Sequence, residues 1–135
     1  MIRAPASPAV AVPHQEEVSS DEKNFRDMFP ANLRTDDGHL VRSRAELLID
    51  NWLYQKGIVH AYERRVPVDE EMYCDFFIPI GAKVYIECWG LNDAKYAARK
   101  EKKKRLYKKY EKKLIEIDEK DIVRLDDILP LKLRP

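Results

Sequence analysis

The sequence predicts a mixed α/β domain whose elements follow in the order α-β-β-β-α-β-α. Three observations support this prediction. Apolar residues recur at helical spacing between residues 44 and 56, three runs rich in β-branched and aromatic residues follow, and a long polar segment with helical character precedes a fourth such run. With 135 residues, the chain is long enough to bury one core without disulfides or a structural metal.

The composition is typical of a globular domain, with 44% hydrophobic and 36% charged residues and a net charge of +1. No run approaches the roughly 18 apolar residues of a membrane span, and the first residues lack a signal-peptide pattern, so we expect a cytoplasmic protein. Residues 1–22 are rich in proline and small residues, which predicts a flexible arm ahead of a single domain over residues 23–135.

The first helix is expected over residues 44–56, and Gly57 suits the left-handed conformation that ends a helix. Ser43 fits the N-cap, with Glu46 reaching back to the N-cap amide in a capping box. One turn further on, Asp50 is expected at the surface. A strand over residues 58–66 follows, and its His60 is assigned no role because a lone strand histidine is usually only hydrogen-bonded.

Two further strands are expected over residues 73–78 and 83–89, joined by a short connection that suits a hairpin. A basic helix should begin at the N-cap Asn92 and reach about residue 112. A fourth strand over residues 114–117 and a short helix that ends before Pro130 complete the chain.

Two acids lie in the hairpin strands, Asp75 and Glu87. If the strands pair residues whose numbers sum to 162, these acids lie opposite each other with Cβ atoms about 5 Å apart. Such like charges require a raised pKa or a bound cation, and oxygen ligands favour Mg²⁺. The same register sets Cys74 opposite Cys88 on the other face, as reduced, buried thiols. Alternatively, both acids are strand-end residues in surface ion pairs, but their apolar neighbours favour the first interpretation.

The third strand ends in the sequence Ile-Glu-Cys-Trp-Gly, residues 86–90. Together with Ser-x-x-Glu at residues 43–46, Tyr-Cys-Asp-Phe at residues 73–76 and the Tyr/Lys-rich helix, it resembles the small members of the PD-(D/E)XK (restriction-endonuclease-like) nuclease superfamily. The resemblance extends from about Arg42 to the C-terminus. It implies an αβββαβ core in which a mixed, four-stranded sheet is flanked by helices.

The resemblance also implies a metal-dependent site for Mg²⁺ or Mn²⁺, with Asp75 and Glu87 as ligands and Glu46 joining them. The chain departs from the family pattern at two positions, because Cys74 replaces the usual proline and Trp89 replaces the usual catalytic lysine. The basic helix offers a substitute cation from a neighbouring element: first Lys103, then Lys100. Glu46 has the capping box as a competing role.

Basic residues on this helix, interrupted by tyrosines, create a local positive field that attracts a phosphate backbone. Six residues are the candidates for DNA binding: Lys95, Tyr96, Arg99, Lys100, Lys103 and Lys104. A solvated basic helix face without a partner is the alternative. Lysine contacts to phosphate read no sequence, so binding should be salt-dependent and weakly specific.

The predicted function is metal-dependent hydrolysis of DNA phosphodiester bonds, with metal-coordinated water as the nucleophile. Two alternatives stay open: a catalytically inactive relative that binds DNA or a protein partner, and an RNA-processing nuclease. Cutting both strands often takes two active sites, which favours a homodimer. The N-terminal arm is the candidate segment for joining a larger complex.

Overall fold

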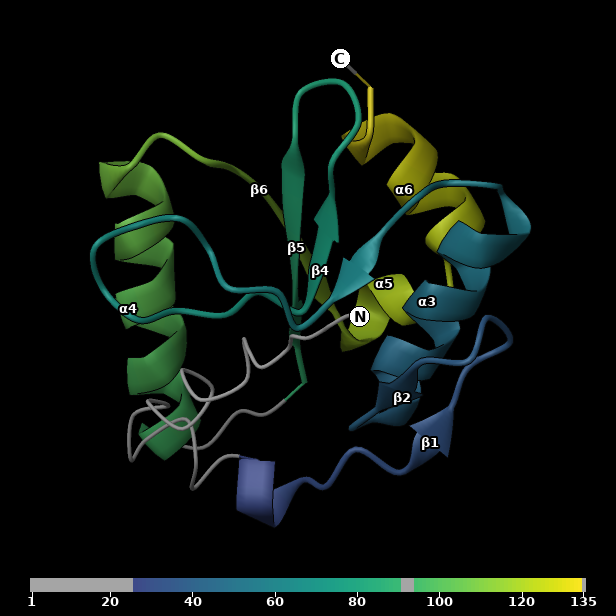
Figure 1. Ribbon diagram of the computed structural model, residues 1–135, viewed down its shortest axis with the longest axis horizontal. Coiled ribbons are helices and arrows are strands. Elements are labelled where there is room, and N and C mark those ends of the chain that lie inside the picture. The colour runs from purple at the N-terminus through teal and green to yellow at the C-terminus, as the bar shows by residue number, and fades with distance from the viewer. Residues whose placement is uncertain (1–25, 91–93, 135) are drawn as a thin grey trace, which may run out of the picture. The chain divides into compact units, whose positions relative to one another are not determined.

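The computed structural model describes residues 26–90 and 94–134 (Figure 1). The predicted arm, residues 1–22, and the predicted N-cap Asn92 lie outside the described residues. The chain divides into two compact units, residues 1–30 and 31–135. Of the first unit only residues 26–30 are described, with a helical turn over residues 26–28. All the elements below belong to the second unit.

The described residues of the second unit form both strands and helices. In chain order they are β1 (Leu33–Arg34), β2 (Leu40–Val41), α3 (Arg44–Gln55), β3 (Ala61–Tyr62), β4 (Phe76–Ile78), β5 (Val84–Trp89), α4 (Ala94–Lys109), β6 (Lys113–Asp118), α5 (Glu119–Ile122) and α6 (Leu125–Lys132). No helix of the described residues is both long enough and apolar enough to cross a membrane.

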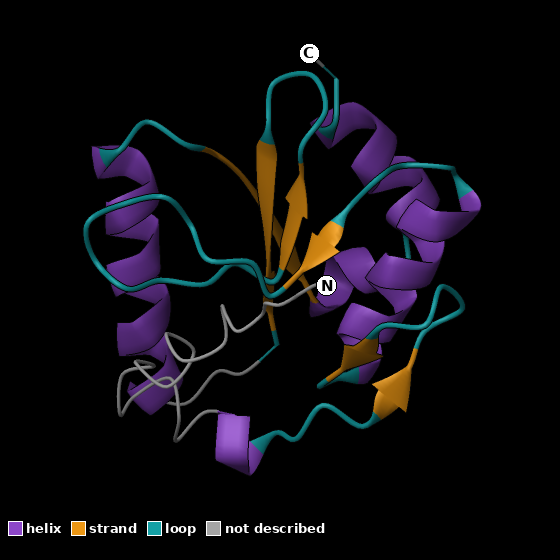
Figure 2. Ribbon diagram, in the orientation of Figure 1, coloured by secondary structure: helices purple, strands orange, loops and turns teal. Residues whose placement is uncertain are grey.

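The main sheet has four strands in the order β3-β4-β5-β6 (Figure 2). The first three are antiparallel, and β6 runs parallel to β5 after the crossover through α4. The expected mixed α/β fold, with a four-stranded mixed sheet and flanking helices, is therefore confirmed. A separate small hairpin pairs β1 with β2.

Each face of the main sheet is covered by its own helices (Figure 1). On one face, α3 and α6 pack against the strands through a large apolar cluster that includes Ile49, Phe76, Ile86 and Leu129. On the other face, Leu106 and Tyr107 of α4 pack with Phe77 and Tyr85 in a second cluster. Because alternate residues of a strand point to opposite faces, β4 and β5 supply both clusters and have few exposed side chains.

The helix boundaries follow from local signals. Ser43 caps α3 by accepting a hydrogen bond from the Glu46 amide, as expected. At the other end Gly57 adopts φ 71°, and the amides of Gly57 and Ile58 bond back to carbonyls of the last turn in a Schellman motif, also as expected. The predicted end before Pro130 is wrong, because Pro130 lies within α6.

The strand predicted over residues 58–66 is mostly wrong, because regular pairing covers Ala61–Tyr62 alone, apart from an isolated bridge further on. The cause is a break in the strand at Glu63, whose φ is 53°. At this break the Glu63 N–H bonds to the Asp75 carbonyl, and the Cys74 N–H bonds to the Arg64 carbonyl. Two neighbouring residue pairs thus each have a hydrogen bond, whereas bonded and non-bonded pairs alternate in a regular antiparallel ladder. The break changes which face the neighbouring side chains occupy.

A further correction concerns the two cysteines, because the chain bends at Asp75, between Cys74 and β4. The hairpin register was predicted to place Cys74 and Cys88 together on one face, but Cys74 is buried in the cluster beneath α4 while Cys88 packs against the cluster on the α3 face. Both thiols are free, and Cys88 is half-buried instead of fully buried.

Candidate active site

Glu87 is a fully buried acid in the middle of a strand, with 0% exposure. It lies on the α4 face of β5, where Lys103 of α4 places its Nζ 2.8 Å from each carboxylate oxygen. The Tyr107 hydroxyl, one turn further along α4, donates a hydrogen bond to Oε2 at 2.5 Å. The lysine favoured from the sequence is therefore the one that meets this acid, and Lys103 is itself 5% exposed.

Asp75 lies in a bend directly before β4. The register predicted for the hairpin is confirmed, because Phe76 pairs with Ile86 and Phe77 pairs with Tyr85, so each pair sums to 162. Continuing this register by one residue sets Asp75 opposite Glu87. The Asp75 side chain turns toward β5, where its Oδ2 accepts a hydrogen bond from the Cys88 amide at 2.7 Å.

Glu46 reaches the same region from α3, on the opposite face of the sheet. Its Oε1 accepts hydrogen bonds from the Arg42 amide at 2.9 Å and from the Tyr62 hydroxyl at 3.0 Å. The capping box is therefore wrong in one half, because Glu46 bonds the amide before the N-cap instead of the Ser43 amide. Only 6% of Glu46 is exposed.

The three acids interact electrostatically through Asp75. Burial raises the pKa of Glu46 to about 8, and the charge of Asp75 adds to the rise, against the hydrogen bonds from Arg42 and Tyr62. Burial also raises the pKa of Glu87 to about 7; Lys103 opposes the rise and Asp75 adds to it. Asp75 thus lies close enough to both acids to shift their proton affinity, and negative charge is concentrated at this end of the strands.

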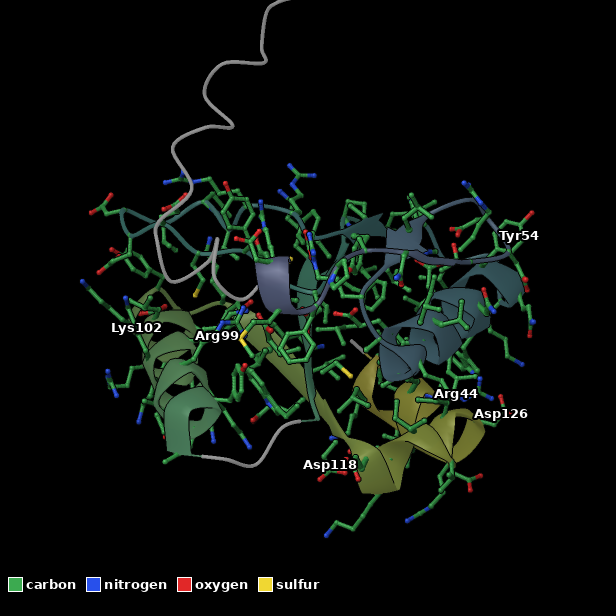
Figure 3. All side chains as sticks on the ribbon, turned by 90° about the horizontal axis from the view of Figure 1, so that it is seen from below. Arg44, Tyr54, Arg99, Lys102, Asp118 and Asp126 are labelled. Carbon is green, nitrogen blue, oxygen red and sulfur yellow. The ribbon has the colours of Figure 1, made fainter. Side chains whose placement is uncertain are left out.

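The other residues predicted for DNA contact all belong to α4. Figure 3 labels one of them, Arg99. Lys100 lies over the Trp89 ring, with Nζ 5.5 Å from the ring centroid, and does not join the Glu87 centre. The Lys104 Nζ atom lies 3.7 Å from Oε1 of Glu116 on β6. Arg99 and Tyr96 are half-buried on the same helix. The Lys95 side chain lies outside the described part of the chain.

Trp89, which occupies the position of the family's usual lysine, has its own place in this arrangement. Its indole N–H donates to Glu116 Oε1 at 2.9 Å, and the Lys103 ammonium lies 6.0 Å from its ring centroid. The Trp89 ring therefore lies near the ammonium groups of Lys100 and Lys103, while Lys103 forms the ion pair with Glu87.

A second cluster was missed from the sequence. Asp37, His39, Asp50 and His60 come together with their ligand atoms within 4.8 Å of one another, and no other group of three or more such residues within residues 26–90 and 94–134 does so. Asp50 was expected at the surface but has 0% exposure, and His60 was assigned no role but faces Asp50. The four residues come from three separate segments, so no spacing in the sequence links them.

The arrangement defines a mixed α/β domain with a buried acid–lysine centre on one face of its sheet and two further acids beside it. Comparisons with protein-family models, with curated proteins and with solved structures each return no significant match for this chain.

Proposed function

We propose that this chain is a cytoplasmic, metal-dependent nuclease that hydrolyses DNA phosphodiester bonds, with its active site at Asp75, Glu87, Glu46 and Lys103. The observation that carries the proposal is the pairing of Lys103 with Glu87 beside Asp75. Lys103 of α4 would thus supply the cation that the third strand lacks at Trp89, the position of the family's usual lysine.

The topology supports assigning the restriction-endonuclease-like core. The elements α3, β3, β4, β5, α4 and β6 follow in the αβββαβ order, with three antiparallel strands and a fourth parallel to the third. In that arrangement Asp75 at the start of the second strand and Glu87 in the third would both face the substrate.

The acids suit a hard divalent cation by their chemistry. All the donors are carboxylate oxygens, and the pKa of Glu46 is raised by burial first and by the nearby charge of Asp75 second, so a bound cation would favour its ionised form. The hydrogen bonds from described residues to Glu46 end on Oε1, and those to Asp75 end on Oδ2, so each carboxylate keeps its other oxygen for a ligand. Glu87 Oε1, which accepts from Lys103 alone, keeps one lone pair.

A bound Mg²⁺ or Mn²⁺ would supply Lewis-acid activation of water and neutralise charge on the phosphate. The chain's own groups would do the rest. Glu87 and Tyr107 hold Lys103 in one position, so its ammonium is aligned before the substrate arrives. Lys103 would then offset the charge that develops on the scissile phosphate. Lys100, near Trp89, is the second candidate for this role.

Nucleic-acid affinity would come from α4. Nine of its sixteen residues are lysine or arginine, while Glu101 is its single acid. Lys102 and Lys108 are exposed on the described surface of this helix. Contacts of this kind bind phosphate without reading bases, so affinity should fall steeply with salt.

A supercoiled-plasmid assay with Mg²⁺ or Mn²⁺ tests the proposal. Lys103→Met and Asp75→Asn should each slow nicking by about 10²-fold or more, since each removes a charge that acts on the transition state. Lys120→Met is the matched control, because it removes an exposed lysine of α5 that belongs neither to the proposed centre nor to α4, and it should nick at the wild-type rate. Equal nicking by all four proteins would identify a contaminant and defeat the assignment.

A catalytically inactive DNA-binding module is favoured by one observation. Glu87 is fully buried, and Lys103 and Tyr107 already occupy three of its acceptor positions. If this alternative holds, the wild type binds duplex DNA with a steep salt dependence but never nicks it. Matched RNA substrates run in parallel identify an RNA-processing nuclease.

A further inference from the structure

Four potential metal ligands meet where the β1–β2 hairpin lies against α3. Asp37 and His39 come from the hairpin turn and the residue after it, Asp50 comes from α3, and His60 comes from the segment just before β3. The turn itself is well fixed: the Thr35 hydroxyl donates to Asp37 Oδ1 at 2.5 Å, and the Thr35 amide bonds to the His39 carbonyl at 2.8 Å.

The distances between these ligand atoms are those of a coordination shell. His60 Nε2 is 3.1 Å from Asp37 Oδ2 and 3.2 Å from Asp50 Oδ1. His39 Nδ1 is 3.4 Å from Asp37 Oδ1 and 2.7 Å from Asp50 Oδ2. Ligands placed about 2.0 Å from a tetrahedral Zn²⁺ are separated by about 3.3 Å. The two distances from His60 and the distance from His39 to Asp37 lie close to this value. The four distances involve both oxygens of Asp37 and both oxygens of Asp50, so binding one ion would need small side-chain adjustments.

The state of His60 indicates that something other than a neutral hydrogen-bond network belongs here. Its Nδ1 lies 2.8 Å from the Ile58 carbonyl oxygen, which only accepts, so Nδ1 carries a proton. This leaves Nε2 facing two carboxylates. A ligating histidine is held in just this way, with its second nitrogen donating to a carbonyl.

Two buried atoms within the cluster have no hydrogen-bond partner in the described part of the chain: His60 Nε2 and Asp50 Oδ1. Their side chains are 4% and 0% exposed, and the two atoms lie 3.2 Å apart. A buried polar atom without a partner costs free energy, and one bound group could serve both of these neighbouring atoms. A cation between them satisfies both.

We propose that Asp37, His39, Asp50 and His60 bind one divalent transition-metal ion, with the chemistry of Zn²⁺. Two imidazole nitrogens exclude a preference for Mg²⁺, which takes oxygen ligands, and four protein ligands leave no open position for substrate. The ion is therefore structural: it fastens the hairpin to α3 and to the start of β3. This inference does not depend on the proposed nuclease function.

The test uses the full chain stripped of metal with a chelator. Co²⁺ is added to follow visible d–d absorption, and Zn²⁺ binding is measured by calorimetry. We expect one equivalent of metal, an intense tetrahedral Co²⁺ spectrum that Zn²⁺ abolishes, and a higher thermal midpoint with Zn²⁺. His39→Gln and His60→Gln should each weaken Zn²⁺ binding by at least about 100-fold, as losing even an outer-shell partner costs 10–100-fold.

Asp36→Asn is the matched control, because Asp36 is exposed in the same turn as Asp37 but does not belong to the cluster. It should bind Zn²⁺ as the wild type does. His39 is 36% exposed by its side chain, so His39→Gln should fold, and circular dichroism checks this. Wild type that binds no Zn²⁺, or His39→Gln and His60→Gln that bind it as tightly as Asp36→Asn, would overturn the proposal.

Discussion

Glu46 gives the sharpest measurable consequence of the charge gathered at the candidate active site. Its carboxyl is buried, lies near Asp75, and has a pKa of about 8 in the folded chain against an ordinary value of 4.5. Glu46→Gln keeps the shape and the acceptor oxygen for the Arg42 amide and the Tyr62 hydroxyl but removes the titration. The variant therefore isolates the cost of ionising this one group.

The sign follows from proton binding. The folded state holds the Glu46 proton more tightly than the unfolded state, so this group's contribution to stability is fully present below about pH 4.5 and is lost as the pH rises through 8. Each pH unit in that window costs about 1.4 kcal/mol, so the loss reaches at most about 5 kcal/mol. Glu46→Gln should match the wild type near pH 4.5 and exceed its stability at pH 8.

Urea unfolding followed by circular dichroism, at pH 5 and pH 8 with a chelator present, measures this difference. Glu101→Gln is the control, because Glu101 is an exposed acid of α4 and its loss should change the free energy of unfolding equally at both pH values. A gain for Glu46→Gln of less than about 1 kcal/mol at pH 8 would refute the reasoning. If Mg²⁺ binds at Glu46, adding Mg²⁺ in place of the chelator should reduce the difference in stability between Glu46→Gln and the wild type at pH 8.

Two further predictions concern stability. Lys103→Met leaves Glu87 buried without its cation and should lower the free energy of unfolding by about 3–5 kcal/mol. The double variant that also carries Glu87→Gln should lose much less stability, as measured by thermal melts followed by circular dichroism. Equal losses in the two variants would contradict a buried charge pair. Glu111, just after α4, has a φ of 54° and the same hydrogen-bond pattern as Gly57. Glu111→Gly should therefore stabilise the chain by about 0.5–1 kcal/mol in urea unfolding, whereas Gly57→Ala should destabilise it. A loss of stability in Glu111→Gly would contradict the strain assigned to Glu111.

The helices and the central hairpin could be predicted from sequence because each depends on local signals. The first helix shows an apolar stripe with a serine cap and a terminal glycine, and the register of β4 and β5 follows from alternating side chains across a short connection. The meeting of Lys103 with Glu87 was anticipated because lysines three or four residues apart on one helix leave few choices for the one facing the sheet.

What could not be predicted depends on backbone conformation and long-range contacts. Nothing in the composition of residues 58–66 indicates that Glu63 adopts a left-handed conformation, which ends the regular pairing of β3 after Tyr62. The local pattern also does not indicate the bend at Asp75, which lies between β4 and Cys74, the thiol found on the α4 face. Asp50 looked like a surface residue because an acid on a helix usually is one. Its burial becomes understandable only when the hairpin brings His39 against it.

The buried face of α3 carries two acids one turn apart, Glu46 and Asp50, and their different partners determine different chemistry. Burial alone would raise the pKa of Asp50, but hydrogen bonds with His60, Asp37 and His39 outweigh it and lower the pKa to about 2, so the carboxylate is kept ionised. Burial raises the pKa of Glu46, and the charge of Asp75 raises it further, which leaves this carboxyl poised to take a proton or a cation. Burying an acid costs free energy, so a helix that buries two in succession retains them only where each has a partner. Asp50 would thus serve the proposed nitrogen–oxygen site that fastens the hairpin, and Glu46 would serve the proposed oxygen-only site near the Lys103 ammonium.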